Sequence, residues 1–251
     1  MKLSFAGIAL SLITLSAVAE EKEFAAELEL GLIQTTGNTA TSSYKGKFDV
    51  RQNLLQWNTH FILEGLYKQD ELEDEYGDKV SQTTAEKYFA SMKGDYKLEK
   101  EHTSLFIYGE YEKNRFSGFD SQYAVALGYS TRVFTTDQSY LAYSVGPGLS
   151  VEESLATESE PSETTENVVV YGSAEYVYTI SEHSKFSQTV SANYATDSDE
   201  NTKTKAVTAV TASINSSLAL KASFTIDYNS LSPEGSEKTD TTTAVTVVYS
   251  F

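Results

Sequence analysis

The sequence predicts an all-β protein: a membrane-spanning, antiparallel, up-and-down β-barrel of about 12 strands, with short periplasmic turns and longer acidic outer loops. Three observations support this prediction. Segments of alternating polarity recur along the chain, the links between them alternate in length, and an export signal precedes them. Most segments are close to the ~10 residues that a tilted strand needs to cross a bilayer.

The N-terminus has the form of a secretory signal. Lys2 precedes an apolar run from Leu3 to Leu15, and Ala17-Val18-Ala19 supplies a small-residue cleavage site. A membrane anchor is the weaker interpretation, because the run is shorter than the ~20 apolar residues of a spanning helix. We therefore predict a signal peptide at residues 1–19, removed on export, and a single barrel domain at 20–251.

The second segment has the clearest strand pattern. Apolar or small residues at 44, 46, 48 and 50 alternate with charged residues at 45, 47, 49 and 51. Segments at 87–98 and 220–229 repeat this alternation, which is typical of a strand with one apolar and one polar face. Lys205–Asn215 gives no clear phase, and Gln188 falls in phase with apolar neighbours. Gly146-Pro147-Gly148 would interrupt a ladder unless it forms a bulge or a bend.

The links indicate the topology. Short turns are expected at 53–55, 99–102, 135–138, 181–184 and 215–217. Mostly longer links fall between them at 35–42, 70–82, 154–166, 196–202 and 231–238, with a shorter one at 114–118. Short periplasmic turns, longer outer loops and an even number of strands are the pattern of bacterial outer-membrane barrels. The competing architecture is a soluble periplasmic sandwich or lipocalin-like barrel, whose apolar face would point inward.

Composition excludes several classes of function. The formal net charge is −17, from 19 basic and 36 acidic residues, which argues against a nucleic-acid partner. Cysteine is absent, so the chain forms no disulfide and no thiolate metal site. The three histidines lack metal-ligand spacing. We therefore predict no cofactor and no metal site.

Three short motifs point to a family. Gly31–Asn38 reads G-L-I-Q-T-T-G-N, Asn114–Asp120 reads N-R-F-S-G-F-D, and Gly146-Pro147-Gly148 comes later in the chain. With these motifs the mature chain resembles the family of salt-induced outer-membrane proteins, whose defining domain has no assigned biochemical function. The resemblance implies an outer-membrane barrel of a Gram-negative bacterium, but no reaction and no substrate.

The last segment, 243–251, alternates and ends on an aromatic residue. It resembles the closing strand of bacterial outer-membrane proteins, where a terminal Phe serves as the assembly signal. The resemblance implies that Tyr249 and Phe251 are read by the barrel-assembly machinery.

The polar face of the segments supplies the candidate functional residues. Charged side chains that face the lumen must be paired or hydrated, because a dry and isolated charge is too costly. Twelve strands lie between the filled eight-stranded barrels and the open sixteen-stranded porins, so the sequence leaves both a plugged and a narrow open lumen possible. The predicted lumen-lining residues are Lys45, Lys47, Asp49, Arg51, His60, Glu64, Lys93, Asp95, Lys97, Glu110, Arg132 and Glu175.

The function predicted first is a narrow pore for ions or small solutes, linked to salt or osmotic stress. The alternative is a closed structural barrel whose acidic loops, such as Asp70–Glu75, bind divalent cations weakly or tune the charge of the envelope. A hydrolase using His60 and a neighbouring hydroxyl is a distant third, and we predict no enzyme. The expected partners are outer-membrane lipid and lipopolysaccharide.

Overall fold

A computed structural model describes residues 23–35, 41–73, 79–114, 117, 119–156, 161–197, 199–232 and 237–251. The predicted signal peptide at 1–19 lies outside the described residues. Among the described residues, no helix is long and apolar enough to cross a membrane.

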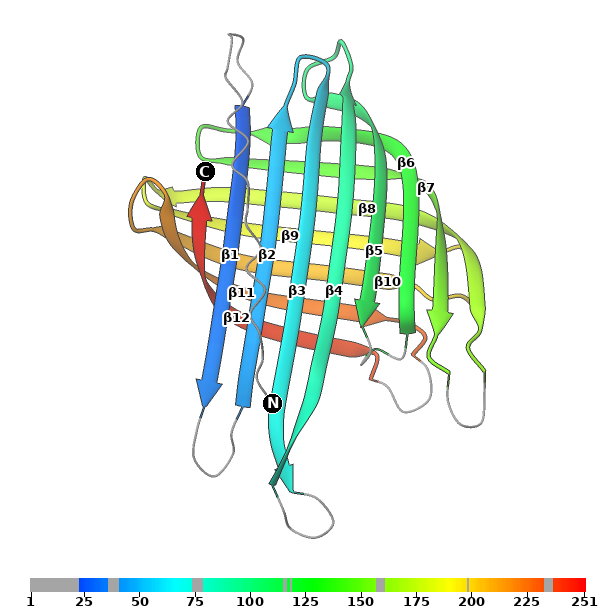
Figure 1. Ribbon diagram of the computed structural model, residues 1–251. Helices are drawn as coiled ribbons and strands as arrows, with labels where there is room; N and C mark the ends of the chain where they lie inside the picture. The colour runs from blue at the N-terminus through cyan, green and yellow to red at the C-terminus, as the bar shows by residue number, and fades with distance from the viewer. Residues whose placement is uncertain are drawn as a thin grey trace, which may run out of the picture.

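The described residues form twelve antiparallel strands that close into one barrel, which confirms the predicted fold class (Figure 1). Each strand pairs with its neighbours in the chain, and β1 pairs with β12. The strands are β1 (Glu23–Thr35), β2 (Thr41–Asn53), β3 (Trp57–Glu73), β4 (Lys79–Lys97), β5 (Thr103–Asn114), β6 (Phe119–Thr135), β7 (Ser139–Ser154), β8 (Thr164–Ser181), β9 (Ser184–Ala195), β10 (Lys203–Ser213), β11 (Leu218–Asn229) and β12 (Thr239–Ser250).

The apolar face of the strands points outward, as predicted for a membrane barrel and not for a lipocalin-like one. On β6, Tyr123, Val125 and Leu127 are exposed, whereas Ala124 and Ala126 are buried. The same alternation of exposed apolar and buried residues recurs along the outer-facing positions of the other strands. Continuous apolar surface of this extent requires a lipid environment, so the barrel spans a membrane.

The two ends of the barrel differ. The first described residue of β1 and the last of β12 lie at the end with the short turns, which we call the periplasmic end, and the longer links lie at the outer end. Aromatic rings gather at the periplasmic rim, where Trp57 packs edge-on against Tyr96 at 5.3 Å and Tyr249 against Phe251 at 4.8 Å. Such rings suit the interface between lipid and water.

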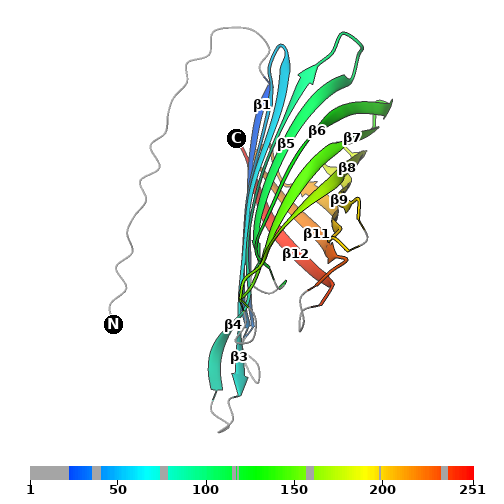
Figure 2. The same cartoon turned by 90° about the vertical axis from the view of Figure 1, so that its right-hand side faces the viewer.

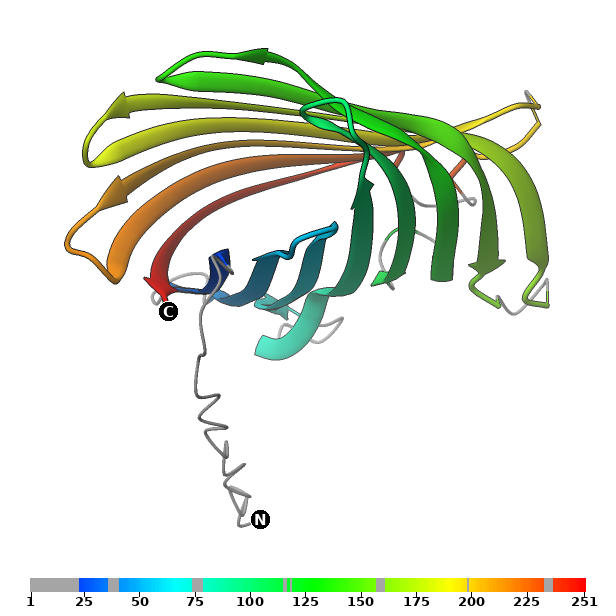
Figure 3. The same ribbon diagram turned by 90° about the horizontal axis from the view of Figure 1, so that it is seen from above.

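The barrel has two differently inclined walls. β1–β4 form one wall and β8–β12 cross behind it at a steep inclination, as Figures 1 and 3 show. In the side view of Figure 2, the strands from β5 to β8 lead from the first wall round to the second. This inclination results from closing a twisted sheet into a barrel.

The Gly-Pro-Gly stretch produces a bend and no bulge. β7 runs through Gly146 and Gly148 without a change of register, but its pairing with β6 is interrupted between Ala126 and Tyr129. There the two backbones come so close that a Cβ on Gly146 would lie 2.0 Å from the carbonyl oxygen of Leu127. Only glycine permits this approach.

One prediction at the level of elements needs correction, and one left open is resolved. The acidic link expected at 70–82 is shorter, because β3 continues to Glu73 and β4 begins at Lys79. In a paired hairpin the backbone N–H and C=O groups of the two strands hydrogen-bond to each other. Strand pairing can therefore continue into an acidic segment outside the membrane. The Lys205–Asn215 stretch, whose sequence shows no clear phase, contributes most of the regular strand β10.

Candidate functional site

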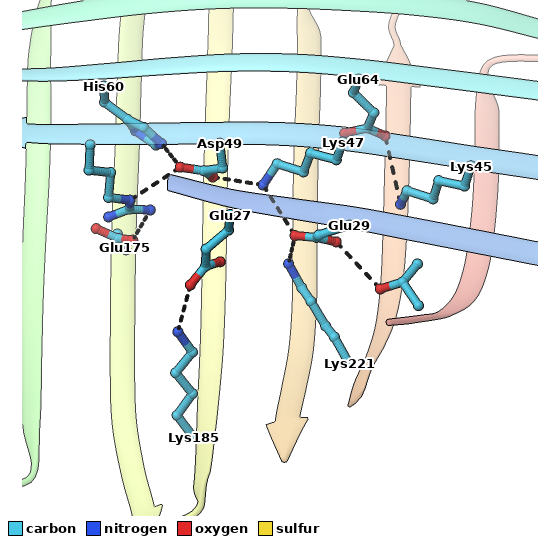
Figure 4. A network of polar contacts seen from close by, with 12 residues as sticks. Glu27, Glu29, Lys45, Lys47, Asp49, His60, Glu64, Glu175, Lys185 and Lys221 are labelled. Carbon is cyan, nitrogen blue, oxygen red and sulfur yellow. Dashed lines mark hydrogen bonds and ion pairs between the residues drawn. The ribbon is translucent and has the colours of Figure 1, made fainter. Parts of the chain in front are cut away.

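A chain of ion pairs crosses the lumen from β11 to β8 (Figure 4). Lys221 on β11 donates a hydrogen bond to Glu29 on β1 at 2.6 Å, and Lys47 on β2 lies 3.8 Å from the same carboxylate. Lys47 also contacts Asp49 at 2.9 Å. These residues occupy inward positions of neighbouring strands, where alternation places every second side chain on the same face.

The chain continues from Asp49 toward the periplasmic end. His60 on β3 lies 2.8 Å from Asp49, and Arg51 lies 3.5 Å from it. Arg51 then reaches Glu175 on β8 at 3.2 Å. Asp49 thus contacts side chains of β2 and β3, and Arg51 connects this group to β8. The arrangement neutralises the inner face locally, as a polar lumen requires.

A second group lies beside this chain. Glu64 is shared by Lys45 at 3.7 Å and Lys205 at 3.8 Å, and the ammonium of Lys205 lies 4.3 Å from the centre of the Phe89 ring. Lys205 was not among the predicted residues. Its position became assignable only through the register of β10, because the sequence around it shows no clear alternation.

The outer half of the lumen is filled by buried polar side chains. Lys87 contacts Asp227 at 2.8 Å and Glu112 at 3.2 Å, and Lys203 lies 3.2 Å from the other oxygen of Glu112. These groups bring β4, β5, β10 and β11 together. Lys203, Glu112 and Asp227 were not among the predicted residues, because their partners lie on strands distant in the sequence.

Nearer still to the outer mouth is a group that we call the outer cluster, Gln122, Glu152, Asn201 and Asn229. The Asn201 amide donates to Glu152 at 2.8 Å and to Asn229 at 3.0 Å, and the Gln122 amide donates to Glu152 at 3.0 Å. All four are buried. Asn201 comes from the link between β9 and β10, so part of that link is folded inward over the lumen.

The remaining predicted residues lie at other inward positions or at the rim. Lys93 contacts Asp95 at 3.1 Å and donates to Ser144 at 2.8 Å. Glu110 accepts from Tyr108 at 2.6 Å and from Asn193 at 2.8 Å. Lys97 donates to Asn53 and to the Leu54 carbonyl at the β2–β3 turn, and the exposed Arg132 stacks on Tyr140, with 4.3 Å between Cζ and the ring centre.

An aromatic cluster adds an apolar element to the lumen. Tyr108 stacks on Tyr171 at 4.5 Å, and Phe106 lies 5.6 Å from Tyr171. The sequence places Phe106 and Tyr108 in phase with Glu110, so the inward face of β5 carries aromatic as well as charged side chains. In the structure both rings are buried on that face. The rings form a buried cluster with Ala126 of β6, and Phe106 lies against Gly128, where β6 and β7 approach closely.

A cavity of about 440 Å³ occupies the lumen between its middle and its periplasmic end. Seven basic and five acidic side chains line it, an excess of two positive charges with His60 neutral. Its periplasmic end is the wetter one: the side chains of Arg51 and Lys185 are each 49% exposed, whereas that of Glu112 in the outer half is 3% exposed. The lumen is therefore more accessible to solvent at its periplasmic end than in its outer half.

No catalytic arrangement emerges from the described contacts. The ring nitrogen Nε2 of His60 is hydrogen-bonded to a carboxylate, and no serine or threonine hydroxyl is hydrogen-bonded to it among the described residues. His102 and His183 are exposed in periplasmic turns. Within the described part of the chain, no group of three or more His, Cys, Asp or Glu side chains is placed to hold a metal ion.

The acidic outer links are described only in part. Residues 74–78 and 157–160 lie outside the described residues, and so do the candidate cation ligands that fall on them, at Asp74, Glu75, Asp78, Glu158 and Glu160. Asp70 contacts Lys68 at 2.7 Å and accepts from Thr84 at 2.7 Å. Glu163, Glu166, Asp197 and Asp199 are exposed.

Comparison with known proteins places the chain in a family. A family model described as "Protein of unknown function, DUF481" matches residues 28–251. The uncharacterised protein YdiY of Escherichia coli K12 is 25% identical over 233 residues, which cover 92% of this chain and 84% of that protein.

Two solved structures illustrate the likeness of shape. An outer-membrane channel from Pseudomonas putida F1 has 8% identity and a TM-score of 0.48, covering 94% of this chain and 97% of that one. The translocator domain of the autotransporter NalP from Neisseria meningitidis has 10% identity and a TM-score of 0.47, covering 91% and 86%. Both TM-scores are below 0.5, so the function of this barrel has to be inferred from its own side chains.

Proposed function

This chain belongs to the family of proteins of unknown function DUF481, and from its lumen we propose that it acts as a narrow, anion-preferring pore for ions or small solutes. Its location would be the outer membrane of a Gram-negative bacterium, reached through the signal at 1–19. The barrel-assembly machinery would read Tyr249 and Phe251. The link to salt or osmotic stress belongs to the same proposal, whereas weak binding of divalent cations by the acidic loops belongs to the closed barrel considered below.

The observation that carries the proposal is the charged cavity in the periplasmic half of the lumen. A cavity with an excess of two positive charges stands out in a chain whose formal net charge is −17. Charged rings in a narrow lumen set ion preference, because field lines are focused by the low-dielectric wall. The excess therefore favours anions over cations inside this cavity, although the whole chain is acidic.

The outer cluster supplies the constriction. Its four side chains are buried and hydrogen-bonded to one another, so passage requires that the link carrying Asn201 moves aside. A pore of this form would conduct in small or infrequent steps. Its wide end would face the periplasm and its narrow end the outer surface.

The first experiment is conductance of the refolded mature protein in a planar bilayer under a salt gradient. We expect reproducible steps and a reversal potential that indicates anion preference. Lys185→Gln removes a charge from the cavity mouth and should lower the anion-to-cation permeability ratio roughly fivefold, the effect of one unit charge at about 1 kcal/mol.

The matched control is Lys113→Gln. Lys113 lies on the outward face of β5 and pairs with Asp120 at 3.2 Å, so the variant has the same net charge as Lys185→Gln without changing the cavity. An equal change in both variants would contradict the proposed role of the cavity charges.

A closed structural barrel is the second candidate, and the ion pairing of the lumen favours it. Lys87, Lys203, Glu112 and Asp227 are joined in one buried network, which would stabilise a filled interior. A folded and inserted protein that stays silent in the bilayer would support this candidate against the pore.

A further inference from the structure

The junction of β1 and β12, which we call the seam, is paired along only part of its length. Among the described residues, β1 pairs with β12 along Glu27–Leu30, opposite Val247–Ser250, whereas it pairs with β2 from Glu23 to Thr35. β12 in turn pairs with β11 from Thr239 onward. Figures 1 and 3 show the two strands side by side near the C-terminus and separating toward the outer end.

The separated part has apolar, outward-facing neighbours, which indicates that it faces lipid. Thr241 and Thr243 of β12 are exposed on the outward face and stand opposite Ile226 and Phe224 of β11. Backbone N–H and C=O groups that face hydrocarbon without a partner cost several kcal/mol each. The outer half of the seam therefore needs a partner with polar groups.

The residues of β12 change character where the ladder ends. Val245, Val247 and Tyr249 face outward along and next to the paired part, whereas Thr241 and Thr243 face outward along the unpaired part. Hydroxyl groups at this depth offer hydrogen bonds to a polar group held within the membrane. The outward-facing residues of β12 thus change from apolar to hydroxyl-bearing in the same part of the strand in which its pairing with β1 is lost.

An apolar groove begins at the other side of the seam. It has a volume of about 540 Å³ and runs over the outward face from β1 to β4. Gly46 and Gly65 stand opposite each other at its floor, where the absence of side chains lowers the surface. Its lining residues include Leu30, Leu32, Tyr44, Tyr67 and Tyr88.

A positive charge stands immediately behind the seam. Lys45 lines both the groove and the lumenal cavity. Residue 31 of β1 is glycine, and a Cβ added there would lie close to both Lys45 on β2 and Thr246 on β12. No side chain of residue 31 therefore separates Lys45 from Thr246. Lys45 is 3.7 Å from Glu64, which Lys205 also approaches, so Lys45 can turn to another anion without leaving Glu64 unpaired.

We propose that the outer half of the seam is a binding site for one anionic membrane lipid. An acyl chain lies in the groove over Gly46 and Gly65. The headgroup enters the seam, where its anionic oxygens meet Lys45 and the hydroxyls of Thr241 and Thr243. The site does not depend on conduction through the lumen, so it stands or falls independently of the proposed pore.

The test uses fluorescence quenching by brominated lipids. In a Trp57→Phe background, Tyr44→Trp reports from the groove, and Tyr123→Trp reports from the outward face of β6 near the same end of the barrel. Each protein is refolded into phosphatidylcholine vesicles that contain a minor fraction of brominated-acyl phosphatidylglycerol or, in parallel, brominated-acyl phosphatidylcholine.

We expect the groove reporter to prefer phosphatidylglycerol by roughly fivefold, the affinity of about one lysine–headgroup contact, and the β6 reporter to show no preference. Lys45→Gln should abolish the preference at the groove. Equal quenching by both lipids at both reporters would overturn the proposal.

A second variant keeps the test independent of the stability of Lys45→Gln. The chain has no cysteine, so Leu32→Cys with Val245→Cys can be cross-linked without competition. If the pairing of Leu30 with Val247 continued in register, these two residues would face each other. Closing the seam in this way should remove the lipid preference, and reduction should restore it. A preference that survives cross-linking would contradict binding within the seam.

Discussion

At the scale of single residues, two glycines permit the bend between β6 and β7. A Cβ on Gly128 would lie 2.2 Å from the carbonyl oxygen of Val145, and one on Gly146 would lie 2.0 Å from that of Leu127. Gly128 pairs with Phe106 of β5, and Gly146 pairs with Tyr171 of β8. Neither backbone can therefore move away without breaking the pairing with its other neighbour. The motif at 146–148 was recognisable in the sequence, but its partner Gly128 was not, because the close approach depends on tertiary register.

We predict that Gly146→Ala destabilises the barrel by more than about 3 kcal/mol or prevents folding, because the added methyl group overlaps backbone. Gly172→Ala on β8 is the control, since a Cβ there meets no heavy atom within 4 Å. Urea unfolding in lipid vesicles, together with heat-modifiable migration on SDS gels, measures both. Similar stability of the two variants would contradict the steric argument.

A second residue-scale feature explains a polar side chain on the lipid-facing side. Gln188 falls in phase with the exposed Val190 and Tyr194, and it accepts a hydrogen bond from Thr208 of β10 at 2.6 Å. The Thr208 hydroxyl and the Gln188 side-chain carbonyl thus satisfy each other's hydrogen bonding in an apolar environment. Such a pair costs less than either partner alone, because an unpaired polar group in lipid keeps its full desolvation penalty.

Thr208→Val should therefore cost about 1–2 kcal/mol in the free energy of unfolding, and Gln188→Leu together with Thr208→Val should be neutral or stabilising. A double-mutant cycle by urea unfolding in vesicles measures the coupling. Additive costs would show that the hydrogen bond contributes nothing to stability.

At the scale of elements, alternation in the sequence indicated about twelve strands, although the stretch that forms most of β10 shows no clear phase, and the lengths of the links indicated the topology. Period-2 patterning is strong in a membrane barrel because one face meets lipid and the other meets polar groups. Register is set by pairing between strands, so the sequence alone did not reveal that Lys205 shares Glu64 with Lys45, or that Lys203 meets Glu112.

Closure of the barrel at the seam depends on the carboxylate of Glu29. Glu29 on β1 lies within 2.6 Å of Lys221 on β11 and 3.5 Å of the Thr246 hydroxyl on β12, so it joins both sides of the short paired part of the seam. It is 2% exposed. Its removal would leave the partly buried Lys221 beside the seam without its closest partner.

Glu29→Ala should destabilise the barrel by about 3–5 kcal/mol, the cost of breaking a buried ion pair from one side. Glu27→Ala is matched in chemistry and strand, but its side chain is 36% exposed and 3.8 Å from Lys185, so it should cost no more than about 1 kcal/mol. Equal losses in urea unfolding would mean that Glu29 has no special role at the seam.

At the scale of the whole molecule, the barrel is asymmetric along its axis. The periplasmic half holds a charged cavity, and the outer half is filled with polar side chains that are hydrogen-bonded to one another. Two outer links meet at this end, because the Thr202 amide donates to the Ser230 hydroxyl at 2.8 Å and the Ser230 amide to the Thr202 carbonyl at 3.0 Å. The state of the outer mouth therefore depends on residues that no alternation pattern identifies.

Asn201 is the residue through which these links reach the lumen, since its side chain also accepts from the Leu231 amide at 3.1 Å. Asn201→Ala removes the bonds to Glu152 and Asn229 and should widen the constriction, so we expect more frequent or larger conductance steps in the planar bilayer. Asp199→Ala, an exposed change in the same link, is the control and should conduct like the parent protein. If both variants match the parent, the outer cluster does not limit passage; if Asn201→Ala alone conducts, the parent barrel is closed at its outer end by this cluster.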